Sequence, residues 1–512
     1  MIHLAFIWHM HQPYYKNLLT DEAELPWVRL HGIKDYADMV TILKDYPAIH
    51  QTFNVVPSLF EQVQAYADGV MSDRFMRLSR KKTINLLQEE RLFIIAHFFM
   101  IDFNKIISRT PRYHELFVQA QEKRIFNDQD ILDLVVWFNL AWFDPDYKNN
   151  IKELREAVAK GRFFTEEEKN RILDIQLEIL KTIIPTYKEY QNKGQIEVSV
   201  TPYFHPILPL LVHSRIAKEA NKKTHLPKKV FSCPRDSSYH IRAAAQFYRN
   251  TFGCAPYGMW PSEQAISKHV ISPIMKNDFK WIVTDEELLF RTLPKKADRS
   301  KSLYRVYYAR KFGRKLCVLF RDRNLSDMIG FSYQNWNAYD AVQDFMKHLQ
   351  SINEHLKGAD ALVTIALDGE NCWEYYENDG KDFLKLLYQN ITESPFIKTV
   401  TVREYLEGRH QLKKLTEIPS GSWIYGDFLK WIGHPAKNKA WELLIDARKQ
   451  LDRMLRPPEL AWKQMYVLEG SDWFWWYGDQ QRQFDELFRL HLKNFYAIIK
   501  KKPPSCIDEP LE

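Results

Sequence analysis

The chain has 512 residues, which is enough for one large domain and a smaller second one. Its net charge of +7 comes from 72 basic and 65 acidic residues scattered along the chain, a pattern that argues against a nucleic-acid-binding protein. The five cysteines show no CxxC spacing, and no apolar run reaches the roughly 18 residues of a membrane span. We therefore expect no disulfide framework, no membrane partner and a cytoplasmic location.

Seven short apolar runs follow one another along the chain, and each ends at or near a polar side chain. They cover residues 2–8, 52–56, 196–200, 257–260, 281–283, 316–320 and 362–367, and residues 306–310 and 398–402 are also strand-like. Continuous apolar runs are typical of parallel strands buried on both faces, and the helix-like segments between them suit βαβ units. The predicted fold class is α/β, a distorted (β/α)7 barrel with polar residues at the carboxyl ends of its strands.

Two regions depart from this pattern and show helical periodicity instead. Residues 71–190 carry phased apolar positions, as in "LLQEERLFIIAHFFMIDFNKII", over a length too great for one connection between strands. We interpret them as a helical insertion in a barrel domain that spans residues 1–405. Residues 406–512 contain amphipathic stretches such as "NKAWELLIDARKQLDRML", which predict a C-terminal helical domain.

Two acidic residues stand just after predicted strands. Glu263 lies in "YGMWPSEQAIS", and Asp368 lies in "VTIALDGENCWE". Two strand-end carboxylates of one barrel can face each other across a cavity, and a separation of about 5 Å permits a retaining glycosidase mechanism with one nucleophile and one acid/base. The alternative for Asp368 is an ordinary helix cap.

The first predicted strand, "HLAFIWHMHQP", delivers His9 and His11 at its end. Alternate residues of a strand share a face, so the two imidazoles could bind a substrate together or, with an aspartate, a metal ion. A metal would indicate a metal-dependent sugar hydrolase or deacetylase, which we keep as an alternative hypothesis.

Five short stretches resemble the motifs of glycoside hydrolase family 57, and they occur in the same order. They are "HQP" at 11–13, "GQIEV" at 194–198, "WPSE" at 260–263, "DGEN" at 368–371 and the region 421–435, so that the resemblance spans about the first 480 residues. It implies a (β/α)7 barrel that acts on α-glucans with retention of configuration. It also implies that Glu263 is the nucleophile and Asp368 the acid/base.

Several residues at these positions are candidate contacts of the sugar. His11 and His9 would bind sugar hydroxyls, and Glu197 would bind hydroxyls or orient a histidine. Trp260, next to the nucleophile, would stack against a pyranose ring. The alternative for Glu197 is a purely structural strand-end carboxylate.

Further candidates are less tied to the strand ends. His205 would be a substrate contact or a buried core histidine, and Arg321 would bind a carboxylate or a sugar hydroxyl, or form a structural cluster with Asp322 and Asp327. The resemblance also implies that the C-terminal helical domain contributes to the active-site cleft, with three residues that reach it: Trp423, Trp431 and Asp472. Packing between domains is the alternative for the two tryptophans, and the favoured interpretation for Trp475 and Trp476.

The leading functional hypothesis is a retaining hydrolase that cleaves α-1,4-glucosidic bonds of starch, glycogen or maltodextrin. It needs no metal or other cofactor, and its partner is an α-glucan or maltooligosaccharide rather than a nucleic acid or a membrane. The fifth stretch and "SDWFWWYGD" look most like amylases and amylopullulanases, which favours hydrolysis. A 4-α-glucanotransferase or branching enzyme would use the same carboxylates, and a non-catalytic glucan-binding protein is a further alternative.

Overall fold

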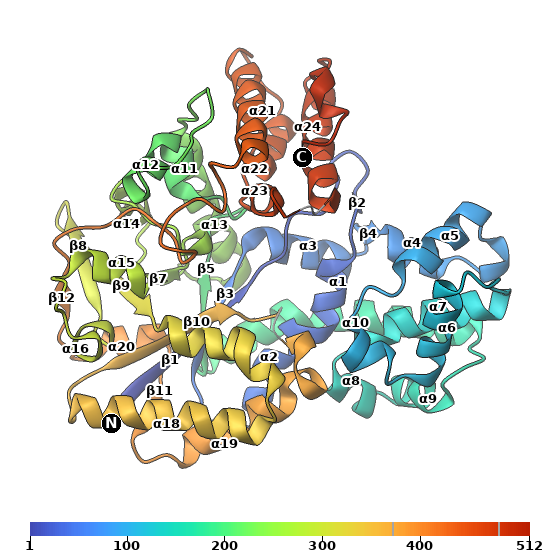
Figure 1. Cartoon of the computed structure of the whole chain (residues 1–512), viewed down its shortest axis with the longest axis horizontal. Coiled ribbons are helices and arrows are strands. Elements are labelled where there is room, and N and C mark those ends of the chain that lie inside the picture. Colours follow the sequence, from blue (N-terminus) through green and yellow to red (C-terminus); the bar gives the residue numbers. More distant parts are fainter. Residues whose placement is uncertain (371–372, 480–481, 512) are drawn as a thin grey trace.

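The computed structural model describes residues 1–370, 373–479 and 482–511, and it is a mixed α/β structure built around a central sheet (Figure 1). Seven parallel strands lie side by side in the order β10, β1, β3, β5, β6, β7, β9. In chain order their bounds are β1 (Ile2–Met10), β3 (Gln51–Val55), β5 (Ile196–Val200), β6 (Gly258–Met259), β7 (Trp281–Asp285), β9 (Arg314–Arg321) and β10 (Leu362–Asp368). Each is one of the predicted apolar runs, so the α/β prediction is confirmed.

The continuous apolar character of these strands has the expected cause. Strand β1 has neighbours on both edges and is covered on both faces, and every residue from Leu4 to Met10 is buried. At the two ends of the seven-strand order, the backbone N–H of Asp322, just after β9, donates to the carbonyl of Thr364 in β10 at 2.8 Å. The first and last strands of the order therefore lie next to each other.

Five shorter strands complete the sheets. β8 (Tyr307–Lys311) pairs antiparallel with β9, β12 (Lys413–Lys414) pairs with β8, and β11 (Ile397–Thr399) pairs with β1. β8 and β11 overlap the two additional strand-like segments of the sequence. β2 (Glu22–Ala23) and β4 (Ser72–Asp73) form a separate two-stranded sheet.

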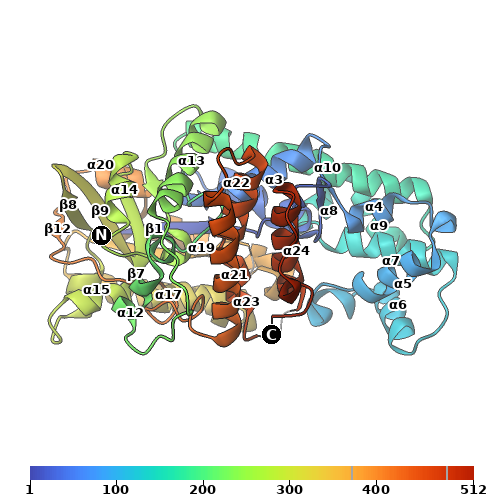
Figure 2. The same ribbon diagram turned by 90° about the horizontal axis from the view of Figure 1, so that it is seen from above.

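A group of helices between β4 and β5 extends to one end of the long axis in both views (Figures 1 and 2). It contains α4 (Arg74–Arg80), α5 (Gln88–His97), α6 (Pro111–Gln121), α7 (Asp128–Ala141), α8 (Pro145–Asn150), α9 (Lys152–Lys160) and α10 (Glu166–Asn192). Capping boxes begin two of them, with Asn127 and Asp130 at α7 and Thr165 and Glu168 at α10. The long α10 leads the chain back to the sheet, where it packs against α3 (Pro57–Ala67).

The C-terminal helices stand above the sheet in Figure 1. They are α21 (Pro435–Asp452), α22 (Glu459–Leu468), α23 (Asp472–Trp476) and α24 (Arg482–Ile498). Buried polar contacts fix them to α13 (Pro234–Phe252), since Arg448 Nε donates to Asp236 at 2.7 Å and His240 Nε2 lies 2.9 Å from Glu469. The segment that carries the aromatic cluster at 473–477 is thereby held against the rest of the protein.

The other α-helices surround the sheet or fill its connections. They are α1 (Trp27–His31), α2 (Asp38–Thr41), α11 (Leu208–Val212), α12 (Ala217–Ala220), α14 (Ile271–Lys276), α15 (Glu286–Thr292), α16 (Arg299–Leu303), α17 (Arg323–Asp327), α18 (Ala338–Leu356), α19 (Lys381–Glu393) and α20 (Val402–Glu407). Over the described residues, none of the helices is both long and apolar enough to cross a bilayer.

Candidate active site

A cleft of about 840 Å³ opens at the carboxyl ends of the parallel strands. One wall comes from the helical stretch after β4 and the other from the C-terminal helices, and both walls are rich in aromatic rings. The residues at or after the strand ends are His9, His11, His205, Glu263 and Asp368, and the walls include Phe103, Trp142, Trp423, Asp472, Trp475, Trp476 and Phe484. The carboxyl groups of Glu263 and Asp368 thus share one cavity with imidazoles and a set of aromatic rings.

Glu263 sits in an unusual backbone conformation just after β6. Its φ is 56° and that of Gln264 is 49°, so two successive non-glycine residues are left-handed. Each such residue costs on the order of 1–3 kcal/mol and persists only where its surroundings hold it. The Trp423 backbone N–H donates to the carbonyl of Glu263 at 3.2 Å, and the Thr284 hydroxyl donates to the carbonyl of Gln264 at 2.8 Å. These two contacts hold the turn that presents the Glu263 carboxyl group to the cleft.

The side chain of Trp423 also holds the Glu263 carboxyl group. Its indole N–H donates to Glu263 Oε2 at 2.8 Å, which leaves Oε1 on the side of His205, 3.9 Å from Nδ1 of that ring. Burial raises the pKa of Glu263 to about 8, and the nearby charge of Asp368 adds to the rise while the Trp423 hydrogen bond opposes it. Glu263 is therefore a well-positioned carboxyl group whose charge is poorly solvated.

Asp368 is the last residue of β10, where it pairs in register with His9 of β1. Burial raises the pKa of Asp368 to about 6, while the neighbouring His11 and Arg321 lower it. Because the Glu263 and Asp368 carboxyl groups also interact, these two values belong to the pair. Near neutral pH the pair keeps one proton, and the higher pKa of Glu263 places it mainly on Glu263. The minor singly protonated state carries the proton on Asp368 and leaves Glu263 ionised.

The three imidazoles form one connected group. His9 Nδ1 lies 2.7 Å from Asn54 Oδ1, His9 Nε2 lies 3.2 Å from His205 Nε2, and His205 Nδ1 lies 2.8 Å from Ser471 Oγ. Asn54 Oδ1 can only accept, so His9 donates from Nδ1 to Asn54 and accepts at Nε2 from His205. His205 in turn accepts at Nδ1 from the Ser471 hydroxyl. Burial lowers the pKa of His9 to about 3 and that of His205 well below its usual value, so both rings are neutral at pH 7.

His11 completes the group and connects it to the C-terminal helices. Its ring stacks on that of His205 with centroids 3.8 Å apart, and its Nε2 lies 2.7 Å from Asp472 Oδ1. The adjacent Gln12 accepts a hydrogen bond from the Tyr15 hydroxyl at 3.1 Å and donates one to Glu370 at 2.9 Å. The "HQP" stretch therefore fixes the floor of the cleft through its side chains.

One set of side chains in the described part of the chain could hold a metal ion. A ligand atom from each of His11, His205 and Asp472 lies within 4.8 Å of the other two. The set is not the predicted one, because both nitrogens of His9 are already engaged by Asn54 and His205. The rings of His11 and His205 lie face to face at 19°, an arrangement in which ring nitrogens point side by side rather than toward a common centre. The set suits hydrogen bonds to hydroxyl groups better than metal coordination.

Two predicted sugar contacts are corrected by the structure, because both are buried away from the cleft. Trp260 has 0% exposure, stacks on His9 at 4.7 Å and meets Trp423 edge to face at 5.5 Å, so its ring cannot serve as a sugar platform. Glu197 is the second residue of β5 and lies toward the amino end of the strand. It accepts hydrogen bonds from the Trp281 indole N–H at 2.9 Å and from the backbone N–H of Arg403 at 2.7 Å. Glu197 is therefore a structural carboxylate, as the alternative interpretation of the sequence stated.

Two further candidates also lie behind the cleft surface. Trp431 has 0% exposure and packs against Trp475 with ring centroids 5.7 Å apart, so it supports the cleft wall without lining it. Arg321 is 5% exposed, and its guanidinium is bound to Asp285 and Asp327 rather than free for a sugar hydroxyl. Asn371 of the fourth stretch lies outside the described residues.

Some cleft residues were not found by sequence reasoning. Trp475 and Trp476 line the cleft, although packing between domains was the favoured interpretation for both. Phe103 and Trp142, from the opposite wall, belong to helical stretches that gave no sign of contact with the strand ends. The only sequence signal for any of them was the density of aromatic residues at 473–477.

The sequence model of glycosyl hydrolase family 57 matches residues 5–419. Comparison with curated proteins gives no match. Among solved structures, a GH57-type branching enzyme from Pyrococcus horikoshii has 15% identity and a TM-score of 0.61, and the alignment covers 100% of this chain and 98% of that one. The alpha-amylase AmyC from Thermotoga maritima has 14% identity and a TM-score of 0.61, with 97% and 93% covered.

A third solved structure is the 4-alpha-glucanotransferase from Thermococcus litoralis, with 14% identity and a TM-score of 0.54, covering 97% of this chain and 60% of that one. At these identities the likeness shows a shared fold. The three structures differ in their reactions, so the fold alone does not select among hydrolysis, transfer and branching.

Proposed function

Because the chain belongs to glycosyl hydrolase family 57, we propose that it is a retaining enzyme that cleaves α-1,4-glucosidic bonds of starch, glycogen or maltodextrin. The observation that carries the proposal is the pair of Glu263 and Asp368, two buried carboxyl groups in one cleft whose raised pKa values leave them one proton near neutral pH. We further propose that the seven parallel strands act as a distorted (β/α)7 barrel within residues 1–405, with the insertion at 71–190. Residues 406–512 would then supply the second wall.

The proposed reaction is a double displacement. A Glu263 carboxylate oxygen attacks the anomeric carbon while Asp368 gives its proton to the glycosidic oxygen, so the bond to the leaving sugar breaks and a glycosyl ester forms. Asp368, now ionised, takes a proton from an entering water, and the oxygen of that water displaces Glu263 from the same carbon. The sugar leaves with its original configuration, and both carboxyl groups return to their starting states.

The surrounding side chains suit a chain of pyranose rings. The hydrogen-bonded His11–Asp472 pair offers polar groups beside Glu263, and the neutral His205, whose two nitrogens are engaged by His9 and Ser471, supports the His11 ring by stacking. Aromatic rings from both walls, including Phe103, Trp475 and Trp476, present apolar faces against which sugar rings stack. Support for an α-glucan rather than another polymer comes from the family and from the reactions named for the three similar structures.

A second candidate is transfer, in which a 4-hydroxyl or 6-hydroxyl of another glucan replaces the water. The observation that favours it is the aromatic character of both cleft walls, because an acceptor sugar binds to such surfaces and water does not. The same two carboxyl groups would perform both half-reactions, so the choice rests on which molecule occupies the acceptor side of the cleft.

Product analysis on a panel of maltodextrins tests both candidates. Hydrolysis gives shorter chains and one new reducing end for each bond broken, 4-α-transfer gives longer chains with no new reducing ends, and branching gives α-1,6 linkages. The Glu263→Gln and Asp368→Asn variants are the matched controls, since each keeps the shape of the side chain and removes its charge. Activity retained by Glu263→Gln would refute the nucleophile assignment, and amylose binding without any change in chain length would indicate a non-catalytic binding protein.

A further inference from the structure

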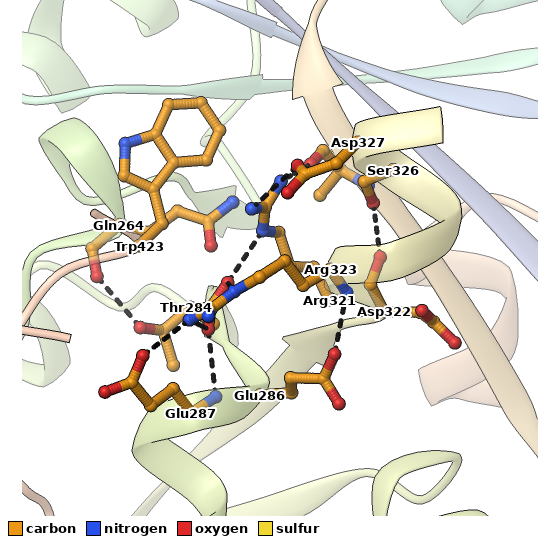
Figure 3. A network of polar contacts seen from close by, with 12 residues as sticks. Gln264, Thr284, Glu286, Glu287, Arg321, Asp322, Arg323, Ser326, Asp327 and Trp423 are labelled. Atoms are coloured by element: carbon orange, nitrogen blue, oxygen red, sulfur yellow. Dashed lines mark hydrogen bonds and ion pairs between the residues drawn. The ribbon is translucent and has the colours of Figure 1, made fainter. Parts of the chain in front are cut away.

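Arg321 is buried and is held by polar contacts from several directions (Figure 3). Its Nε donates to Asp285 Oδ2 at 2.8 Å, one terminal nitrogen lies 3.1 Å from Asp327 Oδ1, and the other donates to the carbonyl of Ala366 at 3.2 Å. Each guanidinium nitrogen thus has an acceptor from the protein. Since Arg321 does not line the cleft, a role for it has to pass through a neighbour.

That neighbour is Trp423. The central carbon of the Arg321 guanidinium lies 5.0 Å from the centroid of the Trp423 ring, within the range of a cation–π contact. The described residues 415–434, which contain Trp423, include no helix and no strand, but backbone hydrogen bonds from Trp423 to Glu263 and between Gly421 and Ile266 anchor this segment. These bonds fix the backbone and leave the orientation of the indole ring to its side-chain contacts. The ring is held by Arg321 and by the edge-to-face contact with Trp260. The same indole donates its N–H to Glu263.

We propose that Arg321, fixed by Asp285 and Asp327, is a positioning residue that holds Trp423 against the Glu263 carboxyl group and places a permanent positive charge near Asp368. The role in catalysis rests on the proposed function, but the link from Arg321 to Trp423 does not. One guanidinium then influences both carboxyl groups, one by contact through an indole and the other through space.

The electrostatic part follows from what surrounds Asp368. Among the described residues, Asp368 interacts electrostatically with His11, Arg321, Glu263 and Glu370. The Arg321 guanidinium is close to it along β10, because it donates to the carbonyl of Ala366, two residues before Asp368. Arg321 is the one permanently charged cation of this set. Burial raises the pKa of Asp368 and Arg321 opposes that rise, so removal of the guanidinium would raise the pKa further.

Arg323 provides a matched control. It belongs to the same polar network in Figure 3, donating to both oxygens of Asp285 and to Glu287 at 2.8 Å. It is a partner of Asp285 like Arg321. Among the described residues, however, Arg321 is the cation over the Trp423 ring, and the charges that lower the pKa of Asp368 are those of His11 and Arg321. Any effect that Arg321→Met has and Arg323→Met lacks belongs to the contact with Trp423 or to the charge near Asp368.

The kinetic experiment measures kcat and KM on a maltooligosaccharide from pH 4 to 10 for the Arg321→Met, Arg321→Lys and Arg323→Met variants. We expect Arg321→Met to lower kcat by about ten- to a hundredfold with KM changed less than about twofold, and to move the acidic limb of the profile upward by about one pH unit. Arg321→Lys keeps the positive charge, so its acidic limb should lie at the wild-type pH, while its kcat should fall between those of Arg321→Met and the wild type. An Arg321→Met profile that coincides with that of Arg323→Met, or a loss confined to KM, would overturn the proposal.

A readout independent of catalysis separates this proposal from the proposed function. In protein labelled with ¹⁵N-tryptophan, the indole N–H signal of Trp423, assigned with Trp423→Phe, should follow the titration of Glu263 and change position in Arg321→Met but not in Arg323→Met. An unchanged signal would overturn the positioning role even in an active enzyme, whereas a shifted signal in a protein inactive on every glucan would contradict only the proposed function. If Arg321→Met does not fold, Asp327→Asn, which removes one partner of the guanidinium, should shift the same signal by a smaller amount, and no shift would overturn the proposal.

Discussion

Replacing Trp423 by phenylalanine tests how the nucleophile is held. The change keeps an aromatic ring beside Arg321 but removes the indole N–H that donates to Glu263 at 2.8 Å. A hydrogen bond to a charged group contributes about 1.5–3 kcal/mol, and here it favours the ionised form of a buried carboxyl group. Its loss corresponds to a rise of about one to two units in the pKa of Glu263.

Two results follow from that rise. The productive state has Glu263 ionised and Asp368 protonated, so its share of the singly protonated pair should fall, and kcat/KM should fall roughly 10- to 150-fold. The alkaline limb of the pH profile should move upward, because the last proton of the pair is then held more tightly. Initial rates on maltooligosaccharides between pH 5 and 10 give both quantities.

A control at the cleft wall separates the hydrogen bond from sugar stacking. Trp476 lines the cleft and stacks on Phe484, whereas the indole that binds Glu263 is that of Trp423, so Trp476→Phe should raise KM and leave the alkaline limb where it is. If Trp423→Phe lowers activity without moving the alkaline limb, Trp423 acts as a packing or stacking residue and the account of Glu263 given above is wrong. Full activity in Trp423→Phe would lead to the same conclusion.

Three further predictions concern the whole enzyme. The pH dependence of activity should be bell-shaped with limbs near pH 6 and pH 8, because the Glu263–Asp368 pair gains a second proton below the lower value and loses its last proton above the upper one. A rate that does not change from pH 5 to 9 would contradict this. Prolonged chelation should leave activity unchanged, whereas loss of activity with recovery on addition of zinc would favour the metal-dependent alternative. Gly258→Ala should destabilise the fold by about 1–3 kcal/mol in chemical denaturation, because its Cβ would meet the Trp281 ring at 1.8 Å, while Gly330→Ala, whose nearest such contact is 3.7 Å, should be close to neutral.

The sequence predicted those parts of the site that depend on local pattern and on parallel strand direction. Continuous apolar runs identified β1 and β10, and because parallel strands end at one edge of the sheet, the residues at their ends had to lie close together. That reasoning placed Asp368 and His9 at the same edge of the sheet, and the register of β1 and β10 adds that they are paired there. The assignment of roles to Glu263 and Asp368 came from the resemblance to the family and remains part of the proposal.

Exposure was decided only by the tertiary structure. Trp260 stands next to the nucleophile in sequence and is fully buried, whereas Trp142 and Trp476, far from any strand end, line the cleft. Whether a tryptophan faces a cavity depends on which distant segments pack over it, and local sequence carries no information about that packing.

The backbone conformation of Glu263 was likewise decided only by the tertiary structure. The left-handed turn at Glu263 and Gln264 contains no glycine, so the sequence gives no sign of it. It exists because Thr284 of β7 and Trp423 of a segment about 160 residues later in the chain bind its carbonyl groups. The sequence thus identified the candidate catalytic residues. Their geometry was set by long-range contacts whose energy exceeds the local backbone preference.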